Sequence, residues 1–261
     1  MSIELELPPK TEDRKEWAQW FLKVYLLLTT LTREERPGFK YASATTVTLS
    51  ASDDNPATFV LGGKLLAIVE DLTMDIATSG AGGLDTGSVA ADTIYYLYAV
   101  NDSDEVSLVA SVTDPNTGPT GFTNWSYLGA MLTDGSSNIP PFMHAQGTMI
   151  LGATSSGWDV TASETSLTSK TVKLPTTAKH GYFRSTWSNV VTIANTLGVG
   201  PTSIESTIKH KANSATAANN NVVHWWVPIL EAQTIYTITS EAADSVGVRV
   251  MGWREHPEEY Q

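Results

Sequence analysis

Residues 59–142 decide the fold class that we expect for this chain, and their sequence is FVLGGKLLAIVEDLTMDIATSGAGGLDTGSVAADTIYYLYAVNDSDEVSLVASVTDPNTGPTGFTNWSYLGAMLTDGSSNIPPF. Short runs of Val, Ile, Leu and Tyr, the strongest at 93–100, alternate here with turn residues. The turns lie at 79–83, 101–105 and 134–138 and are rich in Gly, Asn, Asp or Ser. Turn signals roughly eight to twelve residues apart are typical of a sandwich or barrel. We therefore predict a mainly β protein.

The alternating pattern continues through the C-terminal half of the chain as far as Trp253. We predict two antiparallel β-sandwich modules of a jelly-roll-like kind, at 38–145 and at 146–261. Within the second module, residues 211–221 (KANSATAANNN) have no apolar periodicity and predict an exposed loop. Residues 255–261 predict a short polar tail.

The segment 1–37 differs from the rest because it carries dense charge and a helical apolar spacing. Pro8-Pro9 within it and Pro37-Gly38 at its end would bound a helix on its two sides. Such a helix could pack on its own β body or on symmetry mates in a larger assembly, and we favour the assembly. The residues predicted to form this oligomerisation or docking stripe are Trp17, Trp20, Phe21, Val24, Leu27 and Leu31.

Composition restricts the partners that we expect. The chain of 261 residues has 28 Asp and Glu against 16 Lys and Arg, a formal net charge of −12. This charge argues against a nucleic-acid partner. The chain opens MSIELELPPKTED, which lacks the basic and apolar regions of a signal peptide. The longest apolar run, 17–31, is interrupted by polar residues and is too short to span a bilayer, so we expect no membrane partner.

Motifs that carry chemistry are few in this sequence. There is no cysteine, and the five histidines have no metal-ligand spacing. The glycine-rich stretch 80–87 lacks the Lys-Ser/Thr of a phosphate loop. Asp85-Thr86-Gly87 matches the aspartic-protease triplet, but such enzymes need two facing carboxylates and the triplet occurs once. We therefore predict that the protein is not an enzyme and has no catalytic residues, metal site or cofactor.

Aromatic residues offer the remaining candidates for a binding site. Trp125 and Tyr127 share one face of a strand, and the adjacent Trp225 and Trp226 must point to opposite faces of another. Exposed rings could stack on sugars or contact a partner, whereas buried rings would belong to a sandwich core. For the strand of Trp125 we favour the core, and we expect one of the two adjacent Trp residues to leave its own core.

Three pieces of the stretch 61–142 resemble a recurrent module of tailed-bacteriophage appendage proteins. They are GAGGLDTGSVAADTIYYLYAV, the turn at Pro119–Phe122, and YLGAMLTDGSSNIPPF. The closing VGVRVMGWREHP is similar to the last strand of many phage fibre domains, which end in a Gly-Trp pair. The likeness covers about a third of the chain and includes no reactive residue.

The resemblance implies a structural protein of a phage particle, made in the bacterial cytoplasm and carried on the virion. It implies a homotrimeric tail fibre, head fibre or capsid decoration that contacts other phage structural proteins, with host adsorption through a surface glycan as a further option. The alternative function is a carbohydrate-binding module with an exposed aromatic face.

Overall fold

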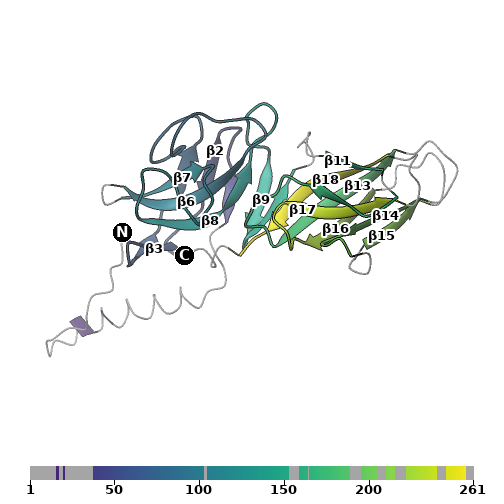
Figure 1. Cartoon of the computed structure of the whole chain (residues 1–261). Helices are drawn as coiled ribbons and strands as arrows, with labels where there is room; N and C mark the ends of the chain where they lie inside the picture. Colours follow the sequence, from purple (N-terminus) through teal and green to yellow (C-terminus); the bar gives the residue numbers. More distant parts are fainter. Residues whose placement is uncertain are drawn as a thin grey trace.

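The computed structural model confirms the mainly β prediction, because antiparallel strands make up most of the residues that it describes (Figure 1). Of the predicted N-terminal helix it describes Glu16, Trp17 and Trp20 alone, so that prediction lies outside the described residues. The described residues are 16, 17, 20, 38–102, 105–152, 159–163, 165–188, 195–204, 210–214, 222–239 and 245–256.

One long sheet runs through both halves of the chain. Its strand order is β16-β13-β18-β10-β9-β1-β2-β5, and β11 also pairs with β18. All of these pairings are antiparallel. The strands are β1 (Phe39–Tyr41), β2 (Thr46–Leu49), β5 (Leu72–Asp75), β9 (Phe142–Ala145), β10 (Thr148–Leu151), β11 (Asp159–Ala162), β13 (His180–Ser188), β16 (Val222–Pro228) and β18 (Ser245–Arg254).

Three smaller sheets complete the described part of the chain. A three-stranded sheet has the order β7-β6-β8, a four-stranded sheet the order β12-β17-β14-β15, and β3 pairs with β4 alone. Their strands are β3 (Ala57–Leu61), β4 (Lys64–Ile68), β6 (Ile94–Asp102), β7 (Glu105–Ser111), β8 (Trp125–Leu132), β12 (Thr168–Thr171), β14 (Asn195–Gly200), β15 (His210–Ser214) and β17 (Thr234–Thr239). The loop predicted at 211–221 is wrong for residues 211–214, which belong to β15, and residues 215–221 lie outside the described part. Pairing with β14 fixes those four residues even though their sequence has no apolar alternation.

The hairpin of β9 and β10 joins the two halves. The predicted boundary between residues 145 and 146 falls at its turn, where Gln146 and Gly147 both have positive φ, as a two-residue type I′ turn requires. β9 pairs with β1 of the N-terminal half, and β10 pairs with β18 at the C-terminal end. The long sheet therefore crosses this point without a break.

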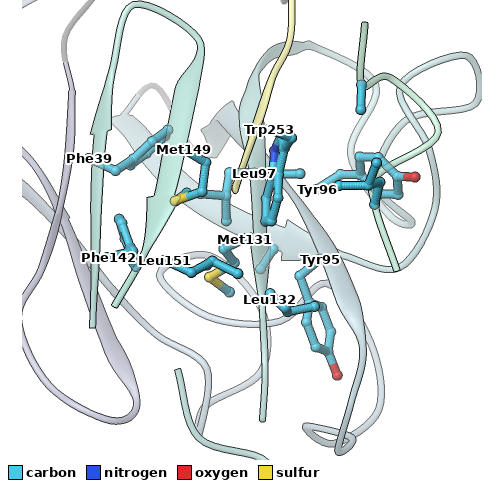
Figure 2. Close-up of a cluster of buried hydrophobic side chains, with 14 of the residues drawn as sticks. Phe39, Tyr95, Tyr96, Leu97, Met131, Leu132, Phe142, Met149, Leu151 and Trp253 are labelled. Atoms are coloured by element: carbon cyan, nitrogen blue, oxygen red, sulfur yellow. The ribbon is translucent and has the colours of Figure 1, made fainter. Parts of the chain in front are cut away.

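A continuous apolar core makes the architecture sandwich-like. Side chains of the long sheet and of the three-stranded sheet meet in one cluster, which Figure 2 shows around Leu97, Met149 and Trp253. Further along, Phe183 and Val248 of the long sheet share the same core with Val199 of the four-stranded sheet. Burial at every second residue along β2 and β17 is what a strand with one covered face produces.

Glu255 ties the two halves together from within this core. The prediction of a polar tail is wrong for this residue, because Glu255 follows β18 directly and is only 2% exposed. Tyr127 Oη donates to its Oε1 at 2.5 Å, and Ala130 N and Trp253 Nε1 donate to its Oε2 at 3.0 and 3.1 Å. The hydroxyl of Thr177 also donates to Oε1. Burial raises the pKa of the Glu255 carboxyl above its ordinary value, against the opposing effect of these four hydrogen bonds.

A β-bulge in β8 makes room for this polar cluster. Leu97 of β6 lies opposite Gly129 and Tyr98 opposite Tyr127, which leaves Leu128 as the extra residue. Gly129 has a φ of +148°, which favours glycine, and a Cβ there would lie 3.3 Å from His144 Nε2. Phe39 N donates to His144 Nδ1 at 3.3 Å. Burial lowers the pKa of His144 to about 4.

Candidate interaction face

The four aromatic residues predicted for ligand or partner contact lie in different environments. Tyr127 is fully buried, and Trp125 is half-buried against Tyr98, with ring centroids 5.4 Å apart. Trp225 and Trp226 point to opposite faces of β16, as expected, because Trp225 is 4% exposed and Trp226 is 37% exposed. Trp226 is therefore the most exposed of the four rings, and the candidate contact face is built around it.

Trp226 is held in place by an aromatic stack across two strands. Tyr182 of β13 is its direct partner in the antiparallel register, and the two rings stack with centroids 4.9 Å apart and planes 25° apart. Tyr182 also stacks with His224 at 5.6 Å and 30°. Such cross-strand pairs restrict the rotamers of both rings. The stack therefore presents Trp226 in one orientation on the outer side of the long sheet.

Arginines lie on the same side of the sheet as this stack. Arg184 of β13 is the register partner of His224 on β16 and of Arg249 on β18. At the other end of these strands, His180 is the register partner of Arg254. Ser185, next to Arg184, and Val248, next to Arg249, are buried. Because side chains alternate along a strand, Arg184 and Arg249 lie on the outer face. We call Tyr182, Arg184, His224, Trp226 and Arg249 the aromatic–arginine face.

The electrostatics of this face differ from those of the whole chain. The strands β13, β16 and β18 contain no Asp or Glu, although the chain has 28 of these residues. One acidic residue borders the face, because Asp159 of β11 is a register partner of Arg249. Burial and then the positive charges of Arg254 and His256 lower the pKa of His180. The strands β13 and β18 thus contribute arginines to this face, and none of the three strands contributes an acidic residue.

Sequence reasoning did not identify Tyr182, Arg184, His224 or Arg249 as members of one site. One signal was available, since the arginines beyond residue 36 are Arg184, Arg249 and Arg254, all in β13 or β18. The alternation of His224 with Trp226 was a second signal. Neither could place β13 between β16 and β18, because that order depends on pairing between distant segments.

The aspartate of the Asp-Thr-Gly triplet holds neighbouring turns together by hydrogen bonds. The Asp85 carboxylate accepts hydrogen bonds from Ser111 Oγ and Thr120 N, each at 2.7 Å, and from Thr86 N at 2.7 Å. These bonds join the glycine-rich turn that precedes β6 to the Pro119–Phe122 turn. Two of the sequence pieces that carry the phage resemblance are therefore held together through one side chain.

The predicted docking stripe is described at two positions. Trp17 and Trp20 make an edge-to-face contact with ring centroids 5.8 Å apart. Phe21, Val24, Leu27 and Leu31 lie outside the described residues. Within the described ranges, no helix has the length and hydropathy needed to cross a bilayer. Nor do the His, Asp and Glu side chains described there form a group of three that could hold a metal ion.

Comparison with known proteins returned no match to a family model, to a curated protein or to a solved structure.

Proposed function

We propose that this protein is a non-catalytic structural component of a tailed-bacteriophage particle, a fibre displayed on the tail or the capsid. The observation that carries the proposal is the long sheet, which passes through both halves of the chain and shares one core with the smaller sheets. A body built in this way resists bending at its midpoint, which suits a protein that must project from a particle. The sequence resemblance of residues 61–142 supports the same function.

In this proposal the body consists of two jelly-roll-like sandwich modules, at 38–145 and 146–261. They are joined edge to edge through the β9–β10 hairpin and fastened by Glu255. The segment 1–37 supplies a docking helix through which three chains associate and attach to other phage structural proteins. The chain is made in the bacterial cytoplasm and becomes part of the virion.

Trimerisation is tested by light scattering coupled to size exclusion on the full chain. The expected mass is three times the 28.1 kDa of one chain. Val24→Asp with Leu27→Asp introduces charge into the docking stripe and should give monomers with an unchanged β circular-dichroism spectrum. Lys23→Asp, at a polar position of the same segment, should leave the trimer intact. A monomeric parent protein would contradict the trimer.

The place of the protein is tested by immunogold labelling of intact phage particles with antibodies raised against the chain. Labelling of the tail or the capsid is expected. Particles that carry no label, although the protein is present in the infected cell, would contradict the virion assignment. The number of copies per particle separates a tail fibre, with a handful, from a capsid decoration, with tens or hundreds.

A second candidate function is that of a carbohydrate-binding module. The observation that favours it is the exposed Trp226, which stacks on Tyr182 on the outer face of the sheet. Fixed aromatic rings that stack on sugars characterise such sites, because the ring is ordered before the ligand arrives. This function is compatible with the first, since a displayed fibre has access to the surface of the host.

A further inference from the structure

We infer that the aromatic–arginine face binds an acidic oligosaccharide, whose sugar ring stacks on Trp226 and whose carboxylate or sulfate groups pair with Arg184 and Arg249. The inference rests on the second candidate function and specifies the chemical class of its ligand. It also adds residues of β13 and β18 to the site. The sequence predicted only that one of the two adjacent tryptophans of β16 leaves its own core.

The aromatic part of the face supplies the stacking surface. Trp226 is 37% exposed, and its contact with Tyr182 at 4.9 Å limits its motion. The electron-rich face of an indole ring attracts the weakly positive C–H groups on one side of a sugar ring. Because the ring is ordered before binding, little side-chain entropy is lost when the ligand arrives.

The arginines supply the preference for an acid. Arg184 and Arg249 are direct register partners on neighbouring strands. Neighbouring strands of a sheet lie about 4.7–4.9 Å apart. Arg184 Nε is a buried atom without a hydrogen-bond partner in the structure. A guanidinium group pairs well with planar carboxylates and with sulfate through two parallel hydrogen bonds.

The charge of the chain restricts the size of the ligand. A net charge of −12 repels a long polyanion such as a nucleic acid, whereas β13, β16 and β18 carry three arginines and no acidic residue. A short acidic glycan can contact this region without approaching the acidic remainder of the surface. His224, next to Trp226 in the stack, could donate a hydrogen bond to a sugar hydroxyl from the same face.

The test uses the full chain and an array of uronate-, sialate- and sulfate-bearing oligosaccharides, each beside its neutral counterpart. We expect retention of at least one acidic glycan and binding of its neutral counterpart about tenfold weaker, as expected for the loss of a charge-assisted hydrogen bond. Trp226→Ala should weaken binding of the retained glycan about tenfold or more. Arg184→Met and Arg249→Met should each remove most of the preference for the acid. Lys40→Met, which makes the same charge change on β1, should leave both affinities unchanged.

The outcomes separate this inference from the functions on which it rests. Equal binding of acidic and neutral glycans that depends on Trp226 would overturn the acidic class and leave a glycan-binding module. A silent array would overturn both, while the virion assignment would still depend on immunogold labelling. Acidic binding unaffected by Arg184→Met and Arg249→Met would place the site elsewhere. Stronger retention of a single-stranded oligonucleotide than of any glycan, or burial of Trp226 between copies of the chain, would also overturn the inference.

Discussion

The carboxylate of Glu255 accepts a hydrogen bond from the hydroxyl of Tyr127 at 2.5 Å, which connects the residue after the last strand to the centre of β8. The two residues are 128 positions apart in the sequence. Both side chains are buried, so this bond and its neighbours join the two halves of the chain within the core. Burial raises the pKa of the Tyr127 hydroxyl well above its ordinary value, with the charge of Glu255 as the next cause. The hydroxyl of Tyr127 therefore keeps its proton and donates a hydrogen bond to the carboxylate.

Replacing Glu255 should weaken the whole fold. Glu255→Ala leaves Trp253 Nε1 and Ala130 N without their acceptor and leaves Tyr127 Oη with Thr177 Oγ1 at 3.2 Å, and we expect it to lower the free energy of unfolding by about 3 kcal/mol or more. Glu255→Gln keeps the shape and one acceptor oxygen and should cost less. Urea denaturation of both variants measures the difference. An alanine variant as stable as the glutamine variant would show that these hydrogen bonds contribute little.

His144 should make stability depend on pH. Its pKa is about 4 in the folded protein against about 6.5 when unfolded, so the unfolded chain binds more protons between these values. Stability should therefore fall as the pH drops from about 6.5 to 4, by up to roughly 3 kcal/mol. The pKa of Glu255 is raised in the folded protein, so the effect of this carboxyl on stability has the opposite sign. Its stabilising contribution is lost as the pH rises from its unfolded pKa through its folded pKa.

The contribution of His144 is isolated by comparison with His144→Gln, whose amide oxygen can accept the hydrogen bond from Phe39 N. Urea denaturation of both proteins at several pH values between 4 and 7 gives the difference in free energy. The stability of the parent protein relative to His144→Gln should fall as the pH drops, because Glu255 is present in both proteins and its contribution cancels in the difference. Parallel pH profiles would contradict the assignment.

Gly129 should not tolerate a side chain. Its φ of +148° and the position of His144 Nε2, 3.3 Å from an added Cβ, both oppose Gly129→Ala, which should cost about 2 kcal/mol. Gly121→Ala is the matched control, because that glycine also has positive φ but has open space around it. The control should cost about 1 kcal/mol, the penalty of the left-handed backbone conformation alone. Thermal unfolding of the two variants provides the comparison, and equal losses would count against crowding by His144.

The adjacent tryptophans of β16 should respond differently to truncation. Trp225→Ala opens a cavity in the core and should lower stability by about 3–5 kcal/mol. Trp226→Ala removes an exposed ring and its stack with Tyr182, which should cost about 1 kcal/mol. Denaturant titration of the two variants measures both values. Similar losses would mean that Trp226 is buried in solution, for example between chains.

Local pattern was sufficient for the strands themselves. The run at 93–100, the strongest strand signal in the sequence, lies almost entirely within β6. Strand prediction worked because alternation reflects a covered and an uncovered face, which each segment carries in its own sequence. It failed at 211–214, where pairing with β14 rather than apolar alternation holds the strand.

The sequence by itself determined that this is a mainly β protein and that adjacent tryptophans on one strand face opposite ways. Tertiary structure alone decided that one sheet continues through 145–146, that Glu255 is a buried acceptor instead of part of a tail, and that arginines of β13 and β18 lie on the same face of the sheet as Trp226 of β16. The physical reason is that periodicity is a property of neighbouring residues. The order of strands in a sheet and the partners of a buried carboxylate depend on contacts between segments far apart in the chain.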